Sequence, residues 1–153
     1  MQVFLKHREW GRDILPVVKG GEVDPSWLHR LQMAGVVVID AYIEHMHELY
    51  QAADCYLFPV SSPTGALEFP LSVIEAAACN LPVITTRFGA LPHVIREGEG
   101  FHYIRSMAEI RERISAIRGA TPRTSEKVRE LSWNTVFTTY LAPHISRLGH
   151  VHD

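Results

Sequence analysis

Residues 54–86 read DCYLFPVSSPTGALEFPLSVIEAAACNLPVITT and carry the strongest structural signal in the chain. Cys55–Phe58 is a short, continuously apolar run closed by Pro59, and a second such run ends at Val83–Thr86. Between them, PLSVIEAAACN has the small residues of a helix that stops at Asn80. Strands without polar alternation are typical of a parallel sheet covered on both faces. The stretch therefore predicts a strand–helix–strand unit with a right-handed crossover.

The same alternation of strand and helix extends to both sides of this unit. Upstream, Val36–Ile39 is another β-branched apolar run, preceded by a helix capped by Asp24 or Ser26 and followed by a helix ending near Ala53. Downstream, Phe101–Ile104 is a weaker strand, and helical patterns follow it to the end of the chain. This order of elements predicts an α/β fold with a doubly wound, Rossmann-like parallel sheet.

The sheet is expected to be parallel throughout, with Val36–Ile39, Cys55–Phe58 and Val83–Thr86 as its central strands. Gln2–Leu5 could add a further strand. Charges, a proline and two adjacent glycines make Lys6–Gly21 irregular or a damaged helix. Without an internal repeat or a linker, the 153 residues are expected to form one domain, residues 1–153.

Composition excludes several classes of protein. A chain that is 46% hydrophobic with a net charge of −2 is globular, and it lacks the basic surface that would favour a nucleic-acid partner. Cys55 and Cys79 lie among apolar residues and are expected to be reduced thiols. No apolar run has the length of a membrane span, and the N-terminus does not resemble a signal peptide. A cytoplasmic domain is expected, with peripheral association at the inner membrane face left open.

Several common site motifs are absent from the sequence. His45 and His47 are two residues apart, so on a helix they would face different sides and make a poor metal pair. There is no Asp-x-Asp, no GxGxxG after a strand, no GxxxxGK[ST] and no GxSxG. The sequence therefore predicts no metal site and no cofactor.

Ligands of this fold bind at the carboxyl ends of the strands, which directs attention to the helix after Cys55–Phe58. Its N-terminus offers the backbone N–H groups of Phe69–Ser72 as a phosphate seat. Glu68 lies at the entrance of this helix, and Glu75 lies within it among small and apolar residues. A carboxylate there needs partners, which the hydroxyls of a ribose, a backbone donor or an arginine would supply.

The segments AADCYLFPV (52–60) and EFPLSVIEAAACNLPVITTRFGALPHVI (68–95) together resemble the donor-binding signature of group 1 glycosyltransferases of the GT-B fold. The resemblance runs from about Val36 to Tyr103, and Trp133 is similar to a residue of the family's C-terminal helix. It implies that the chain corresponds to the C-terminal half of a GT-B enzyme, which binds the nucleotide-sugar. A UDP- or GDP-sugar would then be the donor, a glycan or a lipid-linked molecule the acceptor, and the anomeric configuration would be retained.

The resemblance also implies roles for individual residues. Glu75 matches the second acid of the family's paired-Glu motif, which holds the ribose hydroxyls, and Leu57–Val60 would line the base. The first acid of the motif falls on Leu67. Glu68, one residue closer, is either its catalytic substitute or a surface acid. The expected donor-binding residues are Glu75, Phe69, Pro70, Leu71, Ser72, Gly65 and Thr64, with Glu68 as the catalytic candidate.

The resemblance covers one of the two domains of a GT-B enzyme. The missing domain binds the acceptor, and an early arginine and lysine of the donor domain neutralise the diphosphate. Lys6, Arg8 and Arg12 are the only basic residues early enough for that role, and a solvated charged segment is the other interpretation of them. The isolated chain is therefore expected to bind a nucleotide and transfer no sugar. The alternative is a non-catalytic nucleotide-binding or assembly module of the same fold.

Overall fold

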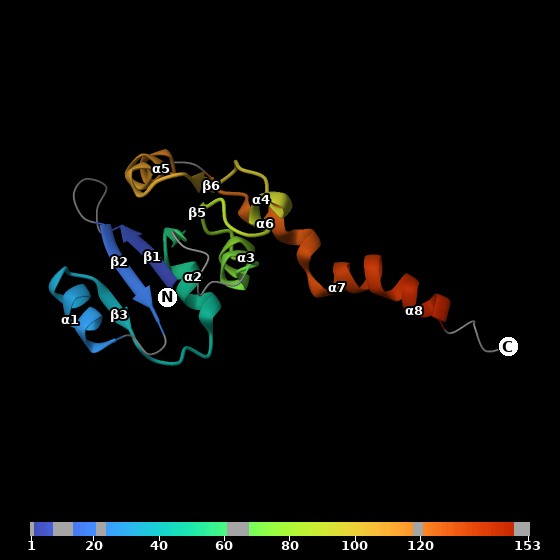
Figure 1. The fold of residues 1–153 in the computed structure, drawn as a ribbon, viewed down its shortest axis with the longest axis horizontal. Helices are drawn as coiled ribbons and strands as arrows, with labels where there is room; N and C mark the ends of the chain where they lie inside the picture. The colour runs from blue at the N-terminus through green and yellow to red at the C-terminus, as the bar shows by residue number, and fades with distance from the viewer. Residues whose placement is uncertain (1, 8–13, 21–23, 61–67, 118–120, 149–153) are drawn as a thin grey trace.

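The computed structural model describes residues 2–7, 14–20, 24–60, 68–117 and 121–148. These residues form a six-stranded sheet in the order β3-β2-β1-β4-β5-β6, with helices packed against it (Figure 1). The strands are β1 (Gln2–His7), β2 (Ile14–Lys19), β3 (Val37–Ile39), β4 (Cys55–Phe58), β5 (Val83–Thr86) and β6 (Phe101–Ile104). The α-helices are α1 (Pro25–Met33), α2 (Met46–Ala52), α3 (Leu71–Ala78), α4 (Leu91–Val94), α5 (Ile110–Ile117), α6 (Thr124–Val128), α7 (Trp133–Val136) and α8 (Ala142–Leu148).

Both faces of the sheet are covered, which explains why its strands are apolar without alternation. On one face, Tyr56 of β4 joins a large buried cluster with residues of α2, α3, α4 and α6. On the other face, Leu57 of β4 and Ile84 of β5 form a smaller cluster that packs against Ile110 and Ile114 of α5. The predicted α/β fold, doubly wound and Rossmann-like, is confirmed.

One strand corrects the expectation of a sheet that is parallel throughout. β1 is antiparallel to both of its neighbours, β2 and β4, whereas β2 pairs with β3, β4 with β5, and β5 with β6 in parallel. Only residues 8–13 separate β1 from β2. A parallel crossover needs about a dozen or more residues. Two successive strands this close in sequence can pair side by side only as an antiparallel hairpin.

Two further expectations about the sheet were wrong. Val37–Ile39 forms an edge strand and not a central one, because β2 occupies the place beside β1. β2 itself lies within the Lys6–Gly21 stretch that the sequence marked as irregular or a damaged helix. Its Pro16 is paired with Leu5 of β1 and lies just before the first residue paired with β3. Pairing with β3 begins one residue later, so the proline leaves no ladder hydrogen bond to β3 unmade.

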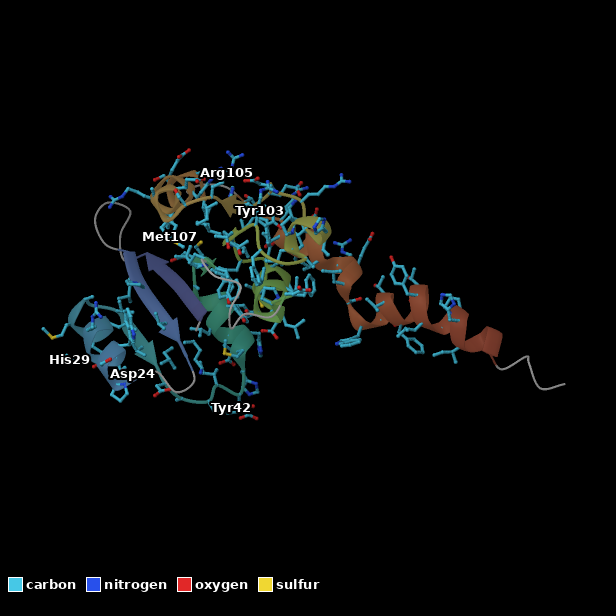
Figure 2. The ribbon with its side chains drawn as sticks, in the orientation of Figure 1. Asp24, His29, Tyr42, Tyr103, Arg105 and Met107 are labelled. Atoms are coloured by element: carbon cyan, nitrogen blue, oxygen red, sulfur yellow. The ribbon has the colours of Figure 1, made fainter. Side chains whose placement is uncertain are left out.

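Several helix ends follow the capping residues expected from the sequence. Asp24, labelled in Figure 2, caps α1 and accepts a hydrogen bond from the Ser26 backbone N–H at 2.8 Å. Ser132 caps α7 through the Thr135 backbone N–H. After α7, a π-helical turn (Phe137–Leu141) leads into α8, and this segment projects from the rest of the domain (Figure 1). None of the described helices combines the length and the apolar character needed to cross a membrane.

Candidate functional site

The carboxyl ends of β4 and β5 are held together by two threonine side chains of β5. The Thr85 hydroxyl donates to the Phe58 carbonyl at 2.8 Å. The Thr86 hydroxyl donates to the Val60 carbonyl at 3.0 Å and accepts from the Val60 backbone N–H at 3.1 Å. These bonds fix the direction in which the chain leaves β4. The predicted ligand-binding edge of the sheet is therefore a tightly hydrogen-bonded part of the fold.

The turn after β5 packs directly against the residue that leads into α3. The Ala90 backbone N–H donates to the Glu68 carbonyl at 3.0 Å. Gly89 has a positive φ of 54°, and a Cβ built on it would lie 2.0 Å from the same carbonyl oxygen. Only glycine permits this approach together with this backbone conformation. The contact fixes the main chain of Glu68 while its side chain is exposed.

The N-terminus of α3 is presented at the same edge of the sheet. Pro70 occupies the N-cap position without a side-chain hydrogen bond to the helix, and it brings no N–H group of its own. Phe69 packs against the large buried cluster, whereas Leu71 is 62% exposed. The first N–H groups of a helix have no partners within the helix. The backbone at Leu71 and Ser72 therefore offers donors, and the positive end of the helix dipole favours an anion there.

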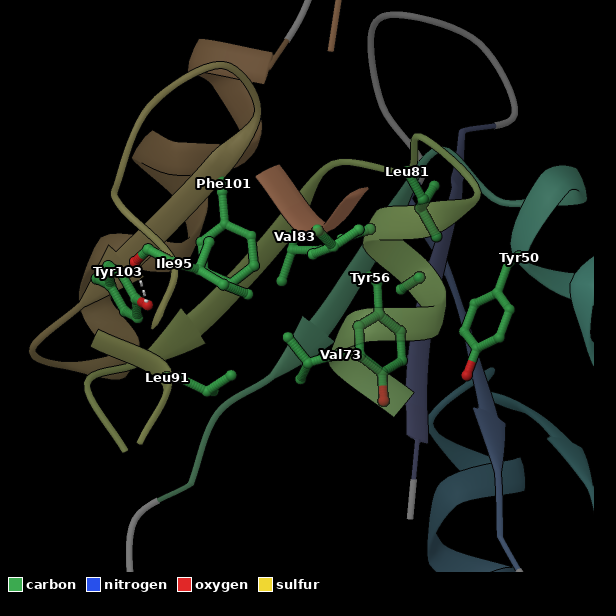
Figure 3. Close-up of a cluster of buried hydrophobic side chains, with 12 residues drawn as sticks. Tyr50, Tyr56, Val73, Leu81, Val83, Leu91, Ile95, Phe101 and Tyr103 are labelled. Carbon is green, nitrogen blue, oxygen red and sulfur yellow. Dashed lines mark hydrogen bonds between the residues drawn. The ribbon is translucent and has the colours of Figure 1, made fainter. Parts of the chain in front are cut away.

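Two buried tyrosines, whose rings are seen in Figure 3, donate hydrogen bonds to polar side chains of α3. The Tyr50 hydroxyl donates to Glu75 Oε2 at 3.0 Å, and the Tyr56 hydroxyl donates to Ser72 Oγ at 2.9 Å. The two rings meet edge to face, with centroids 5.8 Å apart. Both rings are almost completely buried, with 1% of Tyr50 and none of Tyr56 exposed. Glu75 itself is exposed. Its carboxylate therefore lies at the solvent side of α3 while it is held by the buried Tyr50 side chain.

Burial also sets the protonation of groups around the site. It raises the pKa of Tyr56 to about 12, a shift that the hydrogen bond to Ser72 opposes and the Glu75 charge reinforces. Tyr56 therefore remains a neutral hydrogen-bond donor at physiological pH. Burial likewise raises the pKa of the Cys55 and Cys79 thiols, and both are free cysteines as expected. A thiol with a raised pKa is a poor nucleophile.

The structure brings part of the predicted site together. Glu68, Phe69, Pro70, Leu71, Ser72 and Glu75 lie on one continuous segment that enters α3. Thr64 and Gly65 lie outside the described residues. Within the described part of the chain, no three His, Cys, Asp or Glu side chains gather as metal ligands.

The early basic residues do not join this edge of the sheet where the structure describes them. In the β1–β4 pairing, Leu5 lies opposite Cys55, the first residue of β4. Lys6 follows Leu5 and is therefore at the amino end of β4, away from the edge that carries Glu68. Arg8 and Arg12 lie outside the described residues.

Sequence reasoning missed the two tyrosines that contact α3. The sequence places Tyr50 within the helix that ends near Ala53 and Tyr56 within the apolar run Cys55–Phe58, and it predicts no hydrogen-bond partner for either hydroxyl. A signal was available, because a buried tyrosine hydroxyl usually finds a hydrogen-bond partner. It could have indicated that polar groups lie near both residues. The Glu68–Gly89 contact had no comparable signal, since it joins backbone atoms of two loops.

Comparisons with known proteins add a family and a fold. The sequence model of a family described as glycosyl transferases group 1 matches residues 5–120, which is more than half of the chain. Among solved structures, the chain is similar to sucrose-phosphate synthase from Thermosynechococcus elongatus, with a TM-score of 0.58 and 24% sequence identity. The match covers 87% of this chain and 37% of that one, and it shows a shared fold. No curated protein sequence matches significantly.

Proposed function

This chain belongs to the group 1 glycosyltransferases, and on that basis we propose that the carboxyl edge of β4 and β5 binds a nucleotide-sugar donor. The chain would be the donor-binding domain, C-terminal in the whole enzyme, and would work with a separate acceptor-binding domain. The proposed donor is a UDP- or GDP-sugar, and the proposed acceptor is a glycan or a lipid-linked molecule. The two domains would together transfer the sugar with retention of its anomeric configuration.

The observation that carries this proposal is the exposed, anchored carboxylate of Glu75. An ionised carboxylate only accepts hydrogen bonds, and its two oxygens offer about four acceptor sites. Tyr50 occupies one of them. The neighbouring hydroxyls of a ribose are donors and would fill others with charge-assisted hydrogen bonds. Among the described residues, the Tyr50 hydroxyl bonds Glu75 and no arginine forms an ion pair with it.

The diphosphate of the donor would bind one turn earlier in α3. Backbone N–H groups at Phe69, Leu71 and Ser72 supply donors, and the positive end of the helix dipole stabilises the anion. Pro70 interrupts this series, since it lacks an N–H. The spacing along the helix is favourable, because Ser72 and Glu75 are three residues apart and share a face. Phosphate and ribose of one nucleotide would then contact one side of α3.

Glu68 is the proposed catalytic group. Its main chain is fixed by the Ala90 N–H, and its side chain is exposed at the entrance of α3, next to the proposed diphosphate seat. In the transfer, the bond between the anomeric carbon and the diphosphate oxygen breaks, and an acceptor hydroxyl oxygen forms the new bond and releases its proton. A carboxylate beside the sugar would stabilise the positive charge that develops on the anomeric carbon.

The isolated chain is expected to bind the donor and transfer no sugar. Holding two reactants in place lowers a barrier by about 7–11 kcal/mol, and one domain presents the donor alone. A single open edge also leaves the developing charge in water. Sustained transfer by the purified chain, with UDP- or GDP-sugars and mixed glycan or lipid-phosphate acceptors, would contradict this expectation. A nucleotide-binding module without catalysis would still bind, and would remain inactive after an acceptor-binding domain is supplied.

Binding is tested by calorimetry and thermal shift with UDP, GDP and their sugar derivatives. A ligand at a hundred times its dissociation constant stabilises the fold by about 2.7 kcal/mol. Glu75→Gln keeps the shape of the side chain but removes its charge, and we expect about tenfold to hundredfold weaker binding. Glu112→Gln is the matched control, because Glu112 is exposed on α5 across the sheet. Equal affinity of the two variants, or no binding by the natural chain, would refute the proposal.

A further inference from the structure

The hydrogen bond between Tyr50 and Glu75 links α2 to α3, two helices that are separated by β4 in the sequence. Tyr50 belongs to α2, and its side chain reaches across to α3, 25 residues further along the chain. We propose that Tyr50 is a positioning residue, which holds the Glu75 carboxylate in the orientation that receives the hydroxyls of a nucleotide ribose. This inference rests on the proposed donor site and assigns to α2 a part in donor recognition.

The side chains of Tyr50 and Glu75 differ in conformational freedom. The Tyr50 ring is 1% exposed and is wedged edge to face against the Tyr56 ring, at an angle of 79° between the planes. The Glu75 side chain is exposed and has three rotatable bonds, so on its own it would sample many orientations. A hydrogen bond from a fixed phenol to Oε2 restricts that sampling before any ligand arrives. Preorganisation of this kind raises affinity by reducing the ordering cost of binding.

The direction of the contact agrees with this role. Figure 3 shows the hydroxyls of Tyr50 and Tyr56 pointing the same way, away from Leu81, which follows the C-terminal end of α3. The hydrogen bonds place the Tyr56 hydroxyl at Ser72, in the first turn of α3, and the Tyr50 hydroxyl at Glu75, in the middle of the helix. Tyr50 donates to Oε2, and among the described residues no hydrogen bond reaches Oε1. Both carboxylate oxygens lie on the turn of α3 where the ribose is proposed to bind.

A purely structural role makes a different prediction. Any buried phenol hydroxyl needs a partner, and Glu75 would then serve Tyr50 without a consequence for ligand binding. Tyr103 provides the comparison, since it is also buried in the same cluster and its hydroxyl donates to the Ile95 carbonyl at 2.9 Å. Tyr50→Phe and Tyr103→Phe each remove one buried hydroxyl from a ring that stays in place. Only the first removes a contact with Glu75.

The experiment is a double-mutant cycle on nucleotide affinity, measured by calorimetry with UDP and GDP. We expect Tyr50→Phe to weaken binding about tenfold and Tyr103→Phe less than about twofold, with similar losses of thermal stability. In a Glu75→Ala background, Tyr50→Phe should have no further effect on affinity. A 2′,3′-dideoxynucleotide should lose less affinity on Tyr50→Phe than the parent nucleotide, because it lacks the hydroxyls that Glu75 receives.

The outcomes separate this inference from the proposal beneath it. If the natural chain binds and Glu75→Ala weakens binding, but Tyr50→Phe matches Tyr103→Phe, the positioning role is overturned and the donor site stands. The positioning role is also overturned if Tyr50→Phe weakens nucleotide binding as much in the Glu75→Ala background as in the natural chain. If no nucleotide binds the natural chain, the donor site itself is wrong. Should Tyr50→Phe not fold, Glu75→Asp draws the carboxylate back from the hydroxyl, and natural affinity in that variant overturns the inference.

Discussion

Gly89→Ala is the substitution that most directly tests how the candidate site is assembled. Gly89 lies in the turn after β5, with a φ of 54°. An added Cβ would be 2.0 Å from the Glu68 carbonyl oxygen and 2.8 Å from its carbon. Neither atom belongs to a flexible side chain that could move aside. The turn must therefore retreat from Glu68, and the hydrogen bond from Ala90 to the same carbonyl would be lost with it.

The magnitude follows from three contributions. A left-handed conformation costs an alanine about 1–2 kcal/mol. Displacing a packed backbone costs about 1–3 kcal/mol, and the lost hydrogen bond about 1 kcal/mol. We therefore expect Gly89→Ala to lower the free energy of unfolding by about 3–6 kcal/mol. At about 2–4 °C per kcal/mol for a domain of this size, that lowers Tm by roughly 6–24 °C. Nucleotide binding should weaken as well, because Glu68 and the entrance of α3 move with the turn.

Gly35→Ala separates the clash from the conformational strain. Gly35 has a φ of 76°, but a Cβ on it would meet nothing within 4 Å. Its substitution should cost about 1–2 kcal/mol from strain alone, and it should leave nucleotide affinity unchanged. Urea unfolding followed by circular dichroism measures both variants. Equal losses of stability in the two variants would refute the reasoning that the Gly89 turn is fitted against Glu68.

The central part of the fold could be predicted from the sequence because its strands are buried on both faces. Cys55–Phe58 and Phe101–Ile104 begin and end where the apolar runs do. The small residues of α3 have a physical role: Ala76 and Ala77 are fully buried in the large cluster and allow the helix to lie close to the sheet. Short apolar runs rich in β-branched or aromatic residues and bounded by prolines and polar residues are typical of such buried strands.

The N-terminal strands could not be predicted in the same way. The short connection of residues 8–13 makes β1 antiparallel to β2. This can be deduced only after β2 has been recognised as a strand. Pro16 and the neighbouring glycines masked β2, although the proline lies where pairing with β3 has not begun. The apolar pattern of Val37–Ile39 does not distinguish an edge strand from a central one, because a helix can cover either.

The candidate site could be proposed residue by residue along α3, but the contacts of those residues with other elements could not be predicted. Helix N-termini and an acid in an apolar helix are local signals, and they mark Ser72 and Glu75 as candidates. The partners of these residues come from α2 and β4, through side chains that any sequence pattern assigns to the core. Which buried tyrosine meets which polar group depends on how α2 and α3 pack against each other. That arrangement is tertiary and leaves no periodicity in the sequence.

Two further predictions concern buried polar groups on either side of the sheet. The Thr124 hydroxyl is fully buried and hydrogen-bonds two backbone carbonyls at 3.2 and 3.0 Å. Thr124→Val should therefore lower the free energy of unfolding by about 1–3 kcal/mol, whereas Thr138→Val on an exposed helix face should cost well under 1 kcal/mol; similar losses would contradict this. On the other side, burial, and then the Arg113 cation, lower the pKa of the half-buried His102, and the Glu97 carboxylate partly opposes them. The unfolded chain thus binds this proton more readily than the folded one. The contribution of His102 to stability is complete above its ordinary pKa of 6.5 and is lost as the pH falls below it. His102→Gln cannot take up the proton, so we expect its Tm to fall less than that of the natural chain between about pH 7.5 and pH 5.5. The comparison is made by thermal unfolding of both chains in matched salt. An equal fall in the two chains would mean that His102 protonates as easily in the folded state as in the unfolded one, and the partial burial of its ring would then have no electrostatic consequence.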